Sequence, residues 1–274
     1  MKLKDKVVLI TEGASRAGAG IAARLAEEGA HVAVNIFPAD DAAHPAELTP
    51  SVLTPSILTP SILTLHADPA SKAQIDAAVQ EVLQKYGRID VLVFNNNEVI
   101  PANLEDCDDE TYDRIMAINM KSAYLYVVAA GASMKKAKSG NFVFVSSIHD
   151  EKPFGASFAY SMAKGCLKNL AREMVLDMGD AGVRTNVIEM GPIEGEEQYF
   201  YSDLSPLYEH TQAHVRLPRL GNINDIAEAV LYFASDDSGF ANGAELRLDG
   251  GFTLTYFART KRLDRATGQE IRRA

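Results

Sequence analysis

The opening of the chain decides the fold. Residues 7–36 read VVLITEGASRAGAGIAARLAEEGAHVAVNI. The β-branched run Val7–Ile10 predicts a buried parallel strand, and the Gly/Ala/Ser-rich stretch Thr11–Gly20 predicts a turn. Apolar residues recur at helical spacing over Ile21–Glu28, and His31–Ile36 predicts a second strand. A strand, a Gly-rich turn, a helix and a strand within about thirty residues are typical of the first βαβ unit of a dinucleotide-binding fold.

The rest of the chain repeats this alternation. Further strands are predicted at 62–66, 91–94, 142–145, 184–190 and 245–248. Helices are predicted at 71–86, 159–178 and 223–234, and two helical stretches are predicted around Asn119 within 108–137. The pattern predicts one Rossmann-type, doubly wound, mostly parallel seven-stranded sheet with helices on both faces. We expect a single dinucleotide-binding and catalytic domain over residues 1–254, followed by a basic tail over 255–274. Ligands of such sheets bind outside the carboxyl ends of the strands.

Two segments depart from the alternation. Residues 38–61 include the repeat LTPSV at 48–52 and LTPSI at 53–57 and 58–62. Because a proline every fifth residue excludes a regular helix, we expect an extended insertion that covers the sheet edge, with a binding flap as the alternative. Residues 193–217 are irregular and rich in aromatic side chains, which is typical of a substrate lid.

Composition and charge narrow the class of partner. The formal net charge of −10 argues against nucleic acid or an anionic membrane. Cys107 and Cys166 are far apart and lack metal-ligand spacing, so we expect no metal site and a reducing cytoplasm. The N-terminus is too short and too charged for a signal peptide, and no apolar run approaches membrane-spanning length. These features predict a cytoplasmic protein that acts on a small molecule.

A second stretch carries the candidate chemistry. Ser147 follows the predicted strand 142–145, and Tyr160 and Lys164 open the next helix. Tyr160 and Lys164 are four residues apart and therefore share one face of that helix. A nearby ammonium favours the phenolate, which lowers the pKa of the tyrosine and suits it to proton transfer near neutral pH. The alternative is that Tyr160 and Lys164 are a surface pair that occurs by chance. Their position after the fifth strand favours a role in proton transfer.

Over about residues 5–254 the chain resembles the short-chain dehydrogenase/reductase family. The resemblance is carried by the opening βαβ unit, Ala67-Asp68, Asn119, Ser147, Tyr160-Ser161-Met162-Ala163-Lys164, Asn186, Arg219-Leu220-Gly221 and Asp249-Gly250-Gly251. The ordered set is specific, although no single motif is. The resemblance implies hydride transfer between NAD(P) and a carbonyl/alcohol pair, in a homotetramer or homodimer.

The resemblance also implies roles for individual residues. Ser147 would hold the substrate oxygen, and Tyr160 would be the general acid/base. Lys164 would lower the pKa of Tyr160 and bind the nicotinamide ribose. Asn119 would hold the water of a proton relay, although it could instead only bond the helix backbone. Asp68 would contact the adenine. Alternatively, it could only form the turn after its strand.

The chain departs from the family in its first turn. The family pattern there is Thr-Gly-x-x-x-Gly-x-Gly, and an ungapped alignment puts Glu12 and Arg16 at the first two glycines and keeps Gly18. A one-residue insertion would instead align Gly13, Gly18 and Gly20. The Glu12 carboxylate is unfavourable near a pyrophosphate, whereas the Arg16 guanidinium can pair with a phosphate.

Other cofactor positions are altered as well. Asn97 replaces a glycine that leaves room for ribose, and Ile36 stands where an acid would select NAD, which favours NADP slightly. The Pro-Gly pair beside the nicotinamide becomes Met190-Gly191. The expected cofactor-binding residues are Thr11, Gly13, Ser15, Arg16, Gly18, Ile36, Asp68, Asn95, Asn97, Tyr160, Lys164, Gly191 and Ile193.

The residues leave three functions open. The first is an NAD(P)-dependent oxidoreductase. The second is a non-redox enzyme of the same fold, of lyase, isomerase or dehalogenase type, which would use Ser147 and Tyr160 without hydride transfer. The third is a non-catalytic ligand-binding or regulatory protein. His149, Phe154, Tyr199 and Tyr201 suggest a pocket that accepts a ring or a sugar. The alternatives are ordinary lid packing of the aromatic side chains and solvent exposure of His149.

Overall fold

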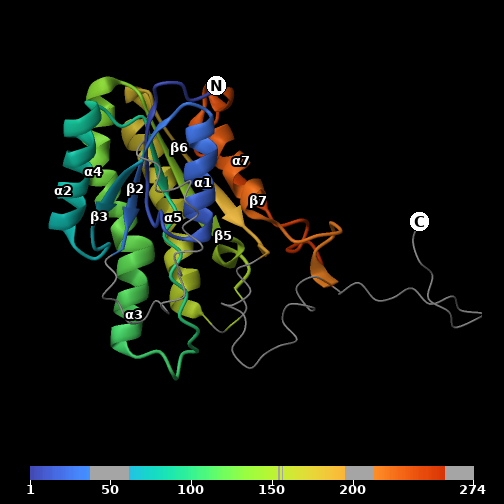
Figure 1. The fold of residues 1–274 in the computed structure, drawn as a ribbon. Helices are drawn as coiled ribbons and strands as arrows, with labels where there is room; N and C mark the ends of the chain where they lie inside the picture. Colours follow the sequence, from blue (N-terminus) through green and yellow to red (C-terminus); the bar gives the residue numbers. More distant parts are fainter. Residues whose placement is uncertain (38–61, 154, 156, 195–212, 257–274) are drawn as a thin grey trace, which may run out of the picture.

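A parallel sheet forms the centre of the molecule (Figure 1). The computed structural model describes residues 1–37, 62–153, 155, 157–194 and 213–256. Its seven strands have the order β3-β2-β1-β4-β5-β6-β7. They are β1 (Val7–Ile10), β2 (His31–Ile36), β3 (Leu63–His66), β4 (Val91–Phe94), β5 (Gly140–Ser147), β6 (Val183–Met190) and β7 (Glu245–Leu248). The predicted Rossmann-type fold is confirmed, and the chain reverses its direction of travel across the sheet between β1 and β4.

Helices cover both faces of the sheet. One face carries α2 (Lys72–Tyr86), α4 (Ser122–Ala137) and α5 (Phe158–Met178), and the other carries α1 (Arg16–Glu27) and α7 (Ile223–Ala234). Alternate residues of each strand face opposite layers, so that Leu9 packs in the first core and Val8 in the second. All four residues of β1 are buried, as expected for a central strand between two helical layers.

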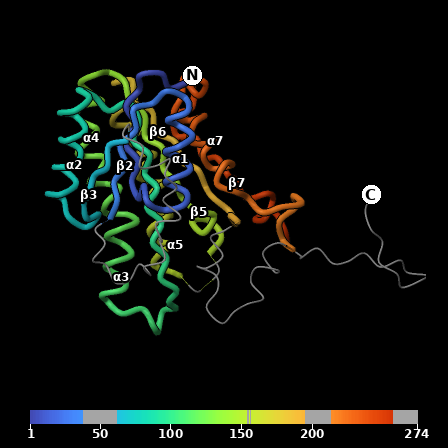
Figure 2. Tube along the Cα trace, in the orientation of Figure 1, coloured from blue at the N-terminus to red at the C-terminus, as the bar shows by residue number. Residues whose placement is uncertain are grey.

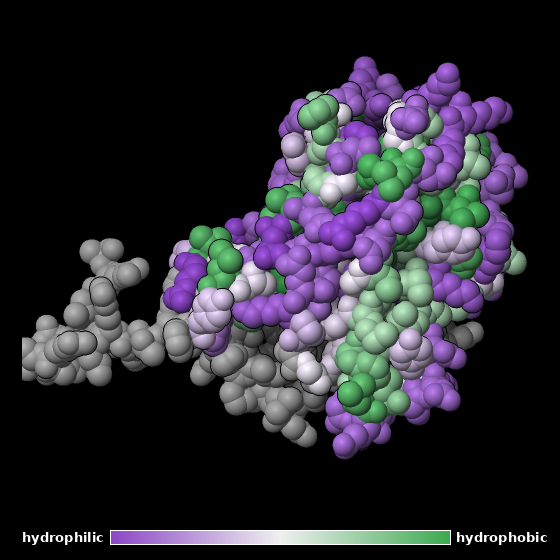
Figure 3. Space-filling view, turned by 180° about the vertical axis from the view of Figure 1, so that it is seen from behind, coloured by the Kyte–Doolittle hydropathy of each residue, from purple (hydrophilic) through white to green (hydrophobic). Residues whose placement is uncertain are grey.

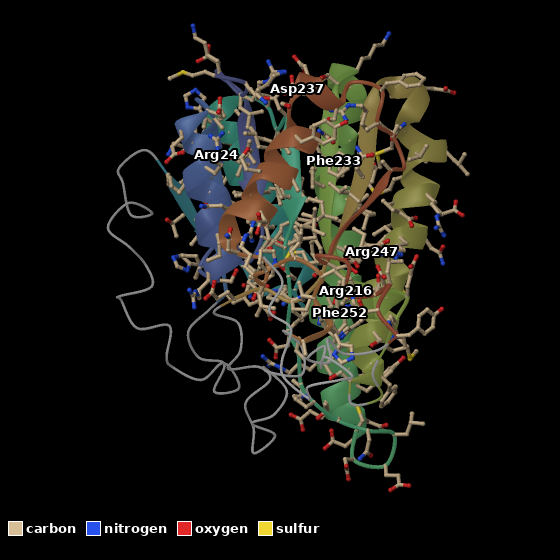
Figure 4. All side chains as sticks on the ribbon, turned by 90° about the vertical axis from the view of Figure 1, so that its right-hand side faces the viewer. Arg24, Arg216, Phe233, Asp237, Arg247 and Phe252 are labelled. Carbon is tan, nitrogen blue, oxygen red and sulfur yellow. The ribbon has the colours of Figure 1, made fainter. Side chains whose placement is uncertain are left out.

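The α1–α7 contact explains one glycine of the opening turn. A Cβ atom on Gly20 would lie 2.0 Å from Cγ2 of Ile223, so a side chain there would push the two helices apart. Arg24 of α1 reaches across to α7, where its Nε atom lies 2.6 Å from Oε1 of Glu228 (Figure 4). Gly20 therefore serves helix packing, and it does not serve as a ligand glycine of the turn.

Predicted boundaries hold within two residues except at the start of α1, and β5 is two residues longer at each end than predicted. Helix α1 starts at Arg16, inside the stretch predicted as a turn, because Ser15 caps it: the Ser15 Oγ atom accepts a hydrogen bond from Gly18 N at 3.0 Å. Strand β5 runs to Ser147, beyond the predicted end, because it pairs with β6 along its whole length. That pairing sets Ser147 beside Met190.

The segment from α3 to α4 is one continuous helix. It comprises α3 (Asp109–Met116), the π-helical turn η1 (Ala117–Lys121) and α4. Over Asp109–Ala137 it has a window of mean hydropathy 1.3, of which 56% is buried, so by length and composition it could cross a membrane. This finding corrects the expectation that no run approaches that length. Its Leu125, Tyr126 and Ala130 lie in the core against the sheet, as in the core helix of a globular protein.

The strands end at the edge of the sheet opposite the N-terminus, and α3 lies beyond that edge (Figure 2). The turn after β1, the asparagines after β4 and the short η2 turn (Ile148–Asp150) after β5 meet there. The insertion at 38–61, most of the expected lid at 193–217 and the tail from 257 onward lie outside the described residues, so their predictions stay predictions.

Candidate active site

The loops that follow β1 and β4 are joined by hydrogen bonds. Asn95 N donates to Thr11 Oγ1 at 2.9 Å, and Asn95 Nδ2 donates to Ser15 Oγ at 3.1 Å. Both Thr11 and Asn95 are buried. The polar side chains after β4 therefore fix the turn that leads into α1, at the point where the strand order reverses.

Tyr160 and Lys164 lie on the same face of α5, as predicted. The Lys164 Nζ atom lies 5.5 Å from the centroid of the Tyr160 ring. Lys164 is fully buried, and its Nζ atom donates to the backbone oxygens of Asn96 at 2.6 Å and Val145 at 3.3 Å. A buried ammonium needs such acceptors, because its transfer out of water is otherwise very costly. The β4 loop thus holds the lysine beneath the phenol.

The Tyr160 hydroxyl has an acceptor on the β4 loop. It donates to Oδ1 of Asn97 at 2.7 Å, and Asn97 N in turn donates to Oε2 of Glu12 at 2.5 Å. The Glu12 side chain is buried, and its backbone has a φ of 50°, in the left-handed region that favours glycine. Glu12 therefore keeps a glycine-like conformation while its carboxylate binds inside the cluster.

His149 lies beside the phenol and is hydrogen-bonded to Ser147. Ser147 is the last residue of β5, and its Oγ atom accepts a hydrogen bond from His149 N at 3.2 Å. The His149 ring meets the Tyr160 ring edge-on, with 5.8 Å between centroids. Burial lowers the pKa of His149 to about 4, so the imidazole is neutral at pH 7. His149 therefore places a neutral polar ring, not a positive charge, beside the phenol.

Asn119 lies in the π-helical turn η1. Its Nδ2 atom donates to the backbone oxygens of Ile115 at 3.1 Å and Glu98 at 2.9 Å. Its Oδ1 atom is buried and has no hydrogen-bond partner among the described residues. The Glu98 carboxylate binds Arg114 Nε at 2.7 Å, which ties the β4 loop to α3. The Asn119 amide therefore bonds the helix backbone, as the structural alternative expects, and its Oδ1 atom still has no partner among the described residues.

The first turn agrees with the ungapped alignment. A Cβ atom on Gly18 would lie 2.2 Å from the backbone oxygen of Glu12, and one on Gly13 would lie 2.4 Å from Val34 Cβ. Gly18 therefore allows the close approach of turn and helix, and the positive φ of Glu12 marks a glycine-like position. Arg16 is exposed at the start of α1, so its side chain does not fill the turn.

Known proteins resemble the chain along almost its whole length. A family model described as enoyl-(acyl carrier protein) reductase matches residues 13–253. An uncharacterized oxidoreductase of Thermotoga maritima is 32% identical over 258 residues, which cover 92% of this chain and 99% of that protein. The chain belongs to the short-chain dehydrogenase/reductase family. It is therefore an enzyme of an oxidoreductase family.

Two further relatives agree with that assignment. The 2-(S)-hydroxypropyl-CoM dehydrogenase 3 of Xanthobacter autotrophicus is 32% identical over 256 residues, with 92% of this chain and 98% of that protein covered. A short-chain dehydrogenase/reductase from Serratia marcescens has the same fold, with a TM-score of 0.79 and 29% identity over 92% of this chain and 100% of that one.

The other residues expected to bind the cofactor of this short-chain dehydrogenase/reductase lie at the end of β2 and after β3 and β6. Ile36 is the last residue of β2 and pairs with His66 of β3. Asp68 follows β3, where its Oδ1 atom accepts from Ala70 N at 2.8 Å, so it shapes a turn as in the alternative reading. Gly191 follows β6, and a Cβ atom there would lie 2.6 Å from Asp249 Cα. Ile193 is buried and bridges to Gly221.

These residues fit a dinucleotide in part. The capped start of α1 presents backbone N–H groups and the exposed Arg16 to an anion, as a pyrophosphate requires. The Gly18 contact shows that the turn keeps its close packing. Glu12 and Asn97, by contrast, add side chains where the family has glycine. We conclude that the pyrophosphate region fits, and that the Asn97 and Glu12 side chains take up space beside Tyr160.

A charged network lies behind Ser147. The Lys168 Nζ atom lies 2.6 Å from Glu189, 2.8 Å from Glu151 and 3.2 Å from Asp150. Glu151, Glu189 and Glu245 have oxygens within 4.8 Å of one another, but Lys168 and arginines pair with them, so they serve as counter-charges. In Figure 4, Arg247 of this network lies on β7 near the C-terminal turn.

Asp150 makes the stability of the protein depend on pH. Burial raises the pKa of its carboxyl to about 6, although Lys168 opposes the shift. Because the folded state holds this proton more tightly than the unfolded state, its stability contribution is present below about pH 4 and is lost as the pH rises through about 6. We expect Asp150→Asn to remove this dependence. Relative to the parent, the variant should gain stability, by about 1 kcal/mol, between pH 4 and pH 8.

Denaturant unfolding of both proteins at the two pH values measures this gain. The exposed Asp180→Asn is the matched control and should show no such gain. An equal pH response of the Asp150→Asn variant and the parent would contradict the assignment.

Sequence reasoning found four of the gathered residues and missed others. Tyr160 and Lys164 lie together on α5, Ser147 ends β5 and Asn119 lies in η1, and their catalytic roles stay predictions. Phe154, Tyr199 and Tyr201 lie outside the described residues. The missed residues are Glu12 as a hydrogen-bond acceptor, Asn96, Glu98 and Arg114. The run of asparagines after β4 was the available signal, because amide side chains at a strand end serve to fix loops.

Proposed function

We propose that the protein is an NAD(P)-dependent oxidoreductase that interconverts a carbonyl and an alcohol, with Tyr160 as general acid/base. The observation that carries the proposal is the hydroxyl of Tyr160, held above the buried Lys164 at the carboxyl edge of the sheet. Membership of a family of dehydrogenases supports it. NAD(P), when bound, supplies the hydride acceptor or donor.

The side chains of this chain would handle the proton. In reduction, the Tyr160 O–H bond breaks and the proton passes to the substrate oxygen, while Ser147 Oγ donates a hydrogen bond to the same oxygen. The Lys164 ammonium stabilises the phenolate that remains, because an opposite charge nearby favours the charged form. The free Oδ1 atom of Asn119 can accept from a water that returns the proton to Tyr160. Oxidation runs the same steps in reverse.

Residues around the first turn would hold the dinucleotide. Ser15, Arg16 and the N–H groups at the start of α1 suit the pyrophosphate. Asn95 would fix the turn, and Thr11 would fix the β4 loop. Ile36 carries no carboxylate that could bond the two ribose hydroxyls of NAD. Arg16 is exposed at the end of the first turn. Together these two features favour NADP slightly over NAD.

A panel of small carbonyl compounds with each reduced dinucleotide tests the function. We expect consumption of the reduced dinucleotide and formation of the alcohol in equal amounts for at least one ring or sugar carbonyl. His149, neutral beside the phenol, suits an uncharged polar substituent on that substrate. Product formation with no change in the dinucleotide would instead identify the non-redox enzyme considered from the sequence.

We also propose that the protein forms a cytoplasmic homodimer or homotetramer through the layer of α4 and α5. Between these helices lies a groove lined by apolar side chains that include Val128, Leu170 and Met174, with Lys135 and Asp177 at its margin. Val128 and Tyr124 remain about half exposed. Figure 3, which looks at the molecule from behind, shows hydrophobic residues in green among hydrophilic ones in purple. A second copy can bury such a face and pair its lysine with the acidic residues.

A charge at the centre of this face tests the interface. We expect Val128→Glu to shift the protein to monomers in sedimentation velocity, because the interface would bury an unpaired carboxylate. The exposed loop residue Leu104, replaced in Leu104→Glu, is the matched control and should leave the assembly unchanged. An unaltered assembly in both variants would place the interface elsewhere.

A further inference from the structure

The peptide group that joins Asn96 and Asn97 is held at both of its polar atoms. Lys164 Nζ donates to its carbonyl oxygen at 2.6 Å, and its N–H donates to Glu12 Oε2 at 2.5 Å. An ammonium and a carboxylate therefore face each other across one peptide. Hydrogen bonds that involve a charged group are shorter and stronger than neutral ones. This arrangement fixes the backbone of Asn97 from two other elements of the fold.

The Asn97 side chain extends from this fixed backbone to the reacting phenol. Its Oδ1 atom accepts the Tyr160 hydrogen bond at 2.7 Å. Tyr160 and Glu12 are both at least nine-tenths buried, so solvent does not compete strongly for these bonds. The turn after β1, the loop after β4 and the start of α5 are thus connected through one asparagine.

The conformation of Glu12 supports a specific role. Its φ of 50° is uncommon for a residue with a side chain and persists only where the surroundings stabilise it. Here the bond from Asn97 N accompanies that conformation. The two positions where the chain replaces family glycines next to the reaction site therefore contact each other directly.

We propose that Asn97 is a positioning residue for the Tyr160 proton and that Glu12 fixes Asn97 for this role. The inference rests on the proposed function. A carboxamide carries an acceptor and a donor, so it can accept from the phenol and, after a half turn, donate Nδ2–H to the phenolate. Asn97 would hold the Tyr160 oxygen in both states, while the proton passes from that oxygen to the substrate oxygen and is replaced through the water at Asn119.

Other titratable and charged side chains belong to the elements packed near Tyr160. They come from α5, η2, the β1 and β4 loops and the start of α3, and they are Lys164, His149, Glu12, Glu98, Arg114, Cys107 and Tyr112. None of them is altered in the Asn97 variants below, so a change in the ionisation of Tyr160 in those variants reports on Asn97.

The first readout is the ultraviolet absorbance of the Tyr160 phenolate without any dinucleotide. It is obtained as the difference between each protein and the same protein carrying Tyr160→Phe. We expect Asn97→Asp to raise the pH midpoint of Tyr160 by about one unit or more, because a carboxylate accepts from the phenol but repels the phenolate. An unchanged midpoint in Asn97→Asp would overturn the proposal.

The second readout is steady-state kinetics. We expect Asn97→Gly to lower kcat about five- to tenfold with little change in KM for the carbonyl, because one hydrogen bond that orients the phenol is lost. Glu12→Ala should show a similar loss, and Glu12→Gln, which keeps an acceptor oxygen, should recover most of the rate. An Asn97→Gly variant as fast as the parent would show that Asn97 only obstructs the site.

Failure of the proposed function would look different. In that case the parent itself would show no dinucleotide-dependent turnover, while the absorbance readout would still decide the role of Asn97. Asn97→Asp has almost the same size as the native side chain, so the absorbance test does not depend on whether the glycine variant folds.

Discussion

Tyr160→Phe is expected to abolish turnover while the protein stays folded. Removal of the hydroxyl removes the group that would transfer the proton, and general acid/base groups contribute about 10²- to 10⁴-fold to the rate. The ring remains in its apolar cluster with Ile115 and Ala159. The hydrogen bond to Asn97 Oδ1 is lost from the fold, so we expect a stability loss of about 1 kcal/mol. Steady-state kinetics and thermal unfolding measure the two effects.

Tyr112→Phe is the matched control for this change. Tyr112 packs against the same cluster, so its variant reports the effect of losing a phenol hydroxyl near the site. We expect near-parent activity from it. If Tyr160→Phe retained a tenth or more of the parent rate, Tyr160 would not be the acid/base.

Lys164→Met is expected to lower the rate and leave the stability nearly unchanged. Lys168→Met is expected to do the reverse. Lys164 is fully buried with two backbone acceptors, and methionine fills the space without the desolvation cost of a charge. We expect a rate loss of about 10²-fold, because the phenolate loses its counter-charge, together with only a small change in unfolding free energy.

Lys168 lies one turn further along α5 and supplies the comparison. Its ammonium pairs with Asp150 and Glu189, whose side chains are almost inaccessible, so Lys168→Met leaves buried carboxylates without their partner. We expect a stability loss of about 3 kcal/mol with a much smaller effect on the rate of the folded fraction. Equal effects of the two variants on both rate and stability would contradict the separate roles of the two lysines.

The fold was readable from the sequence because its signals are local. The runs Val7–Ile10, His31–Ile36 and Val91–Phe94 became strands with the predicted bounds, since buried parallel strands need continuous apolar stretches. The start of α1 was misplaced because the Ser15 cap lies within a Gly-rich stretch that also suits a turn. The end of β5 was missed because it depends on pairing with β6, which no local pattern encodes.

The site was only partly readable, for a similar reason. Tyr160 and Lys164 are four residues apart, so helical geometry alone places them together. The Glu12–Asn97 contact joins residues 85 positions apart, and sequence reasoning suggested only that Glu12 would repel an anion. Its carboxylate instead accepts from Asn97 N, in a conformation that a glutamate rarely adopts.

The central claim is that a nicotinamide dinucleotide binds beside Tyr160, and titration calorimetry with NAD, NADH, NADP and NADPH tests it most directly. We predict one site per chain, with tighter binding of the NADP pair, retained binding in Tyr160→Phe and weaker binding in Lys164→Met. Folded protein that binds none of the four would contradict the account.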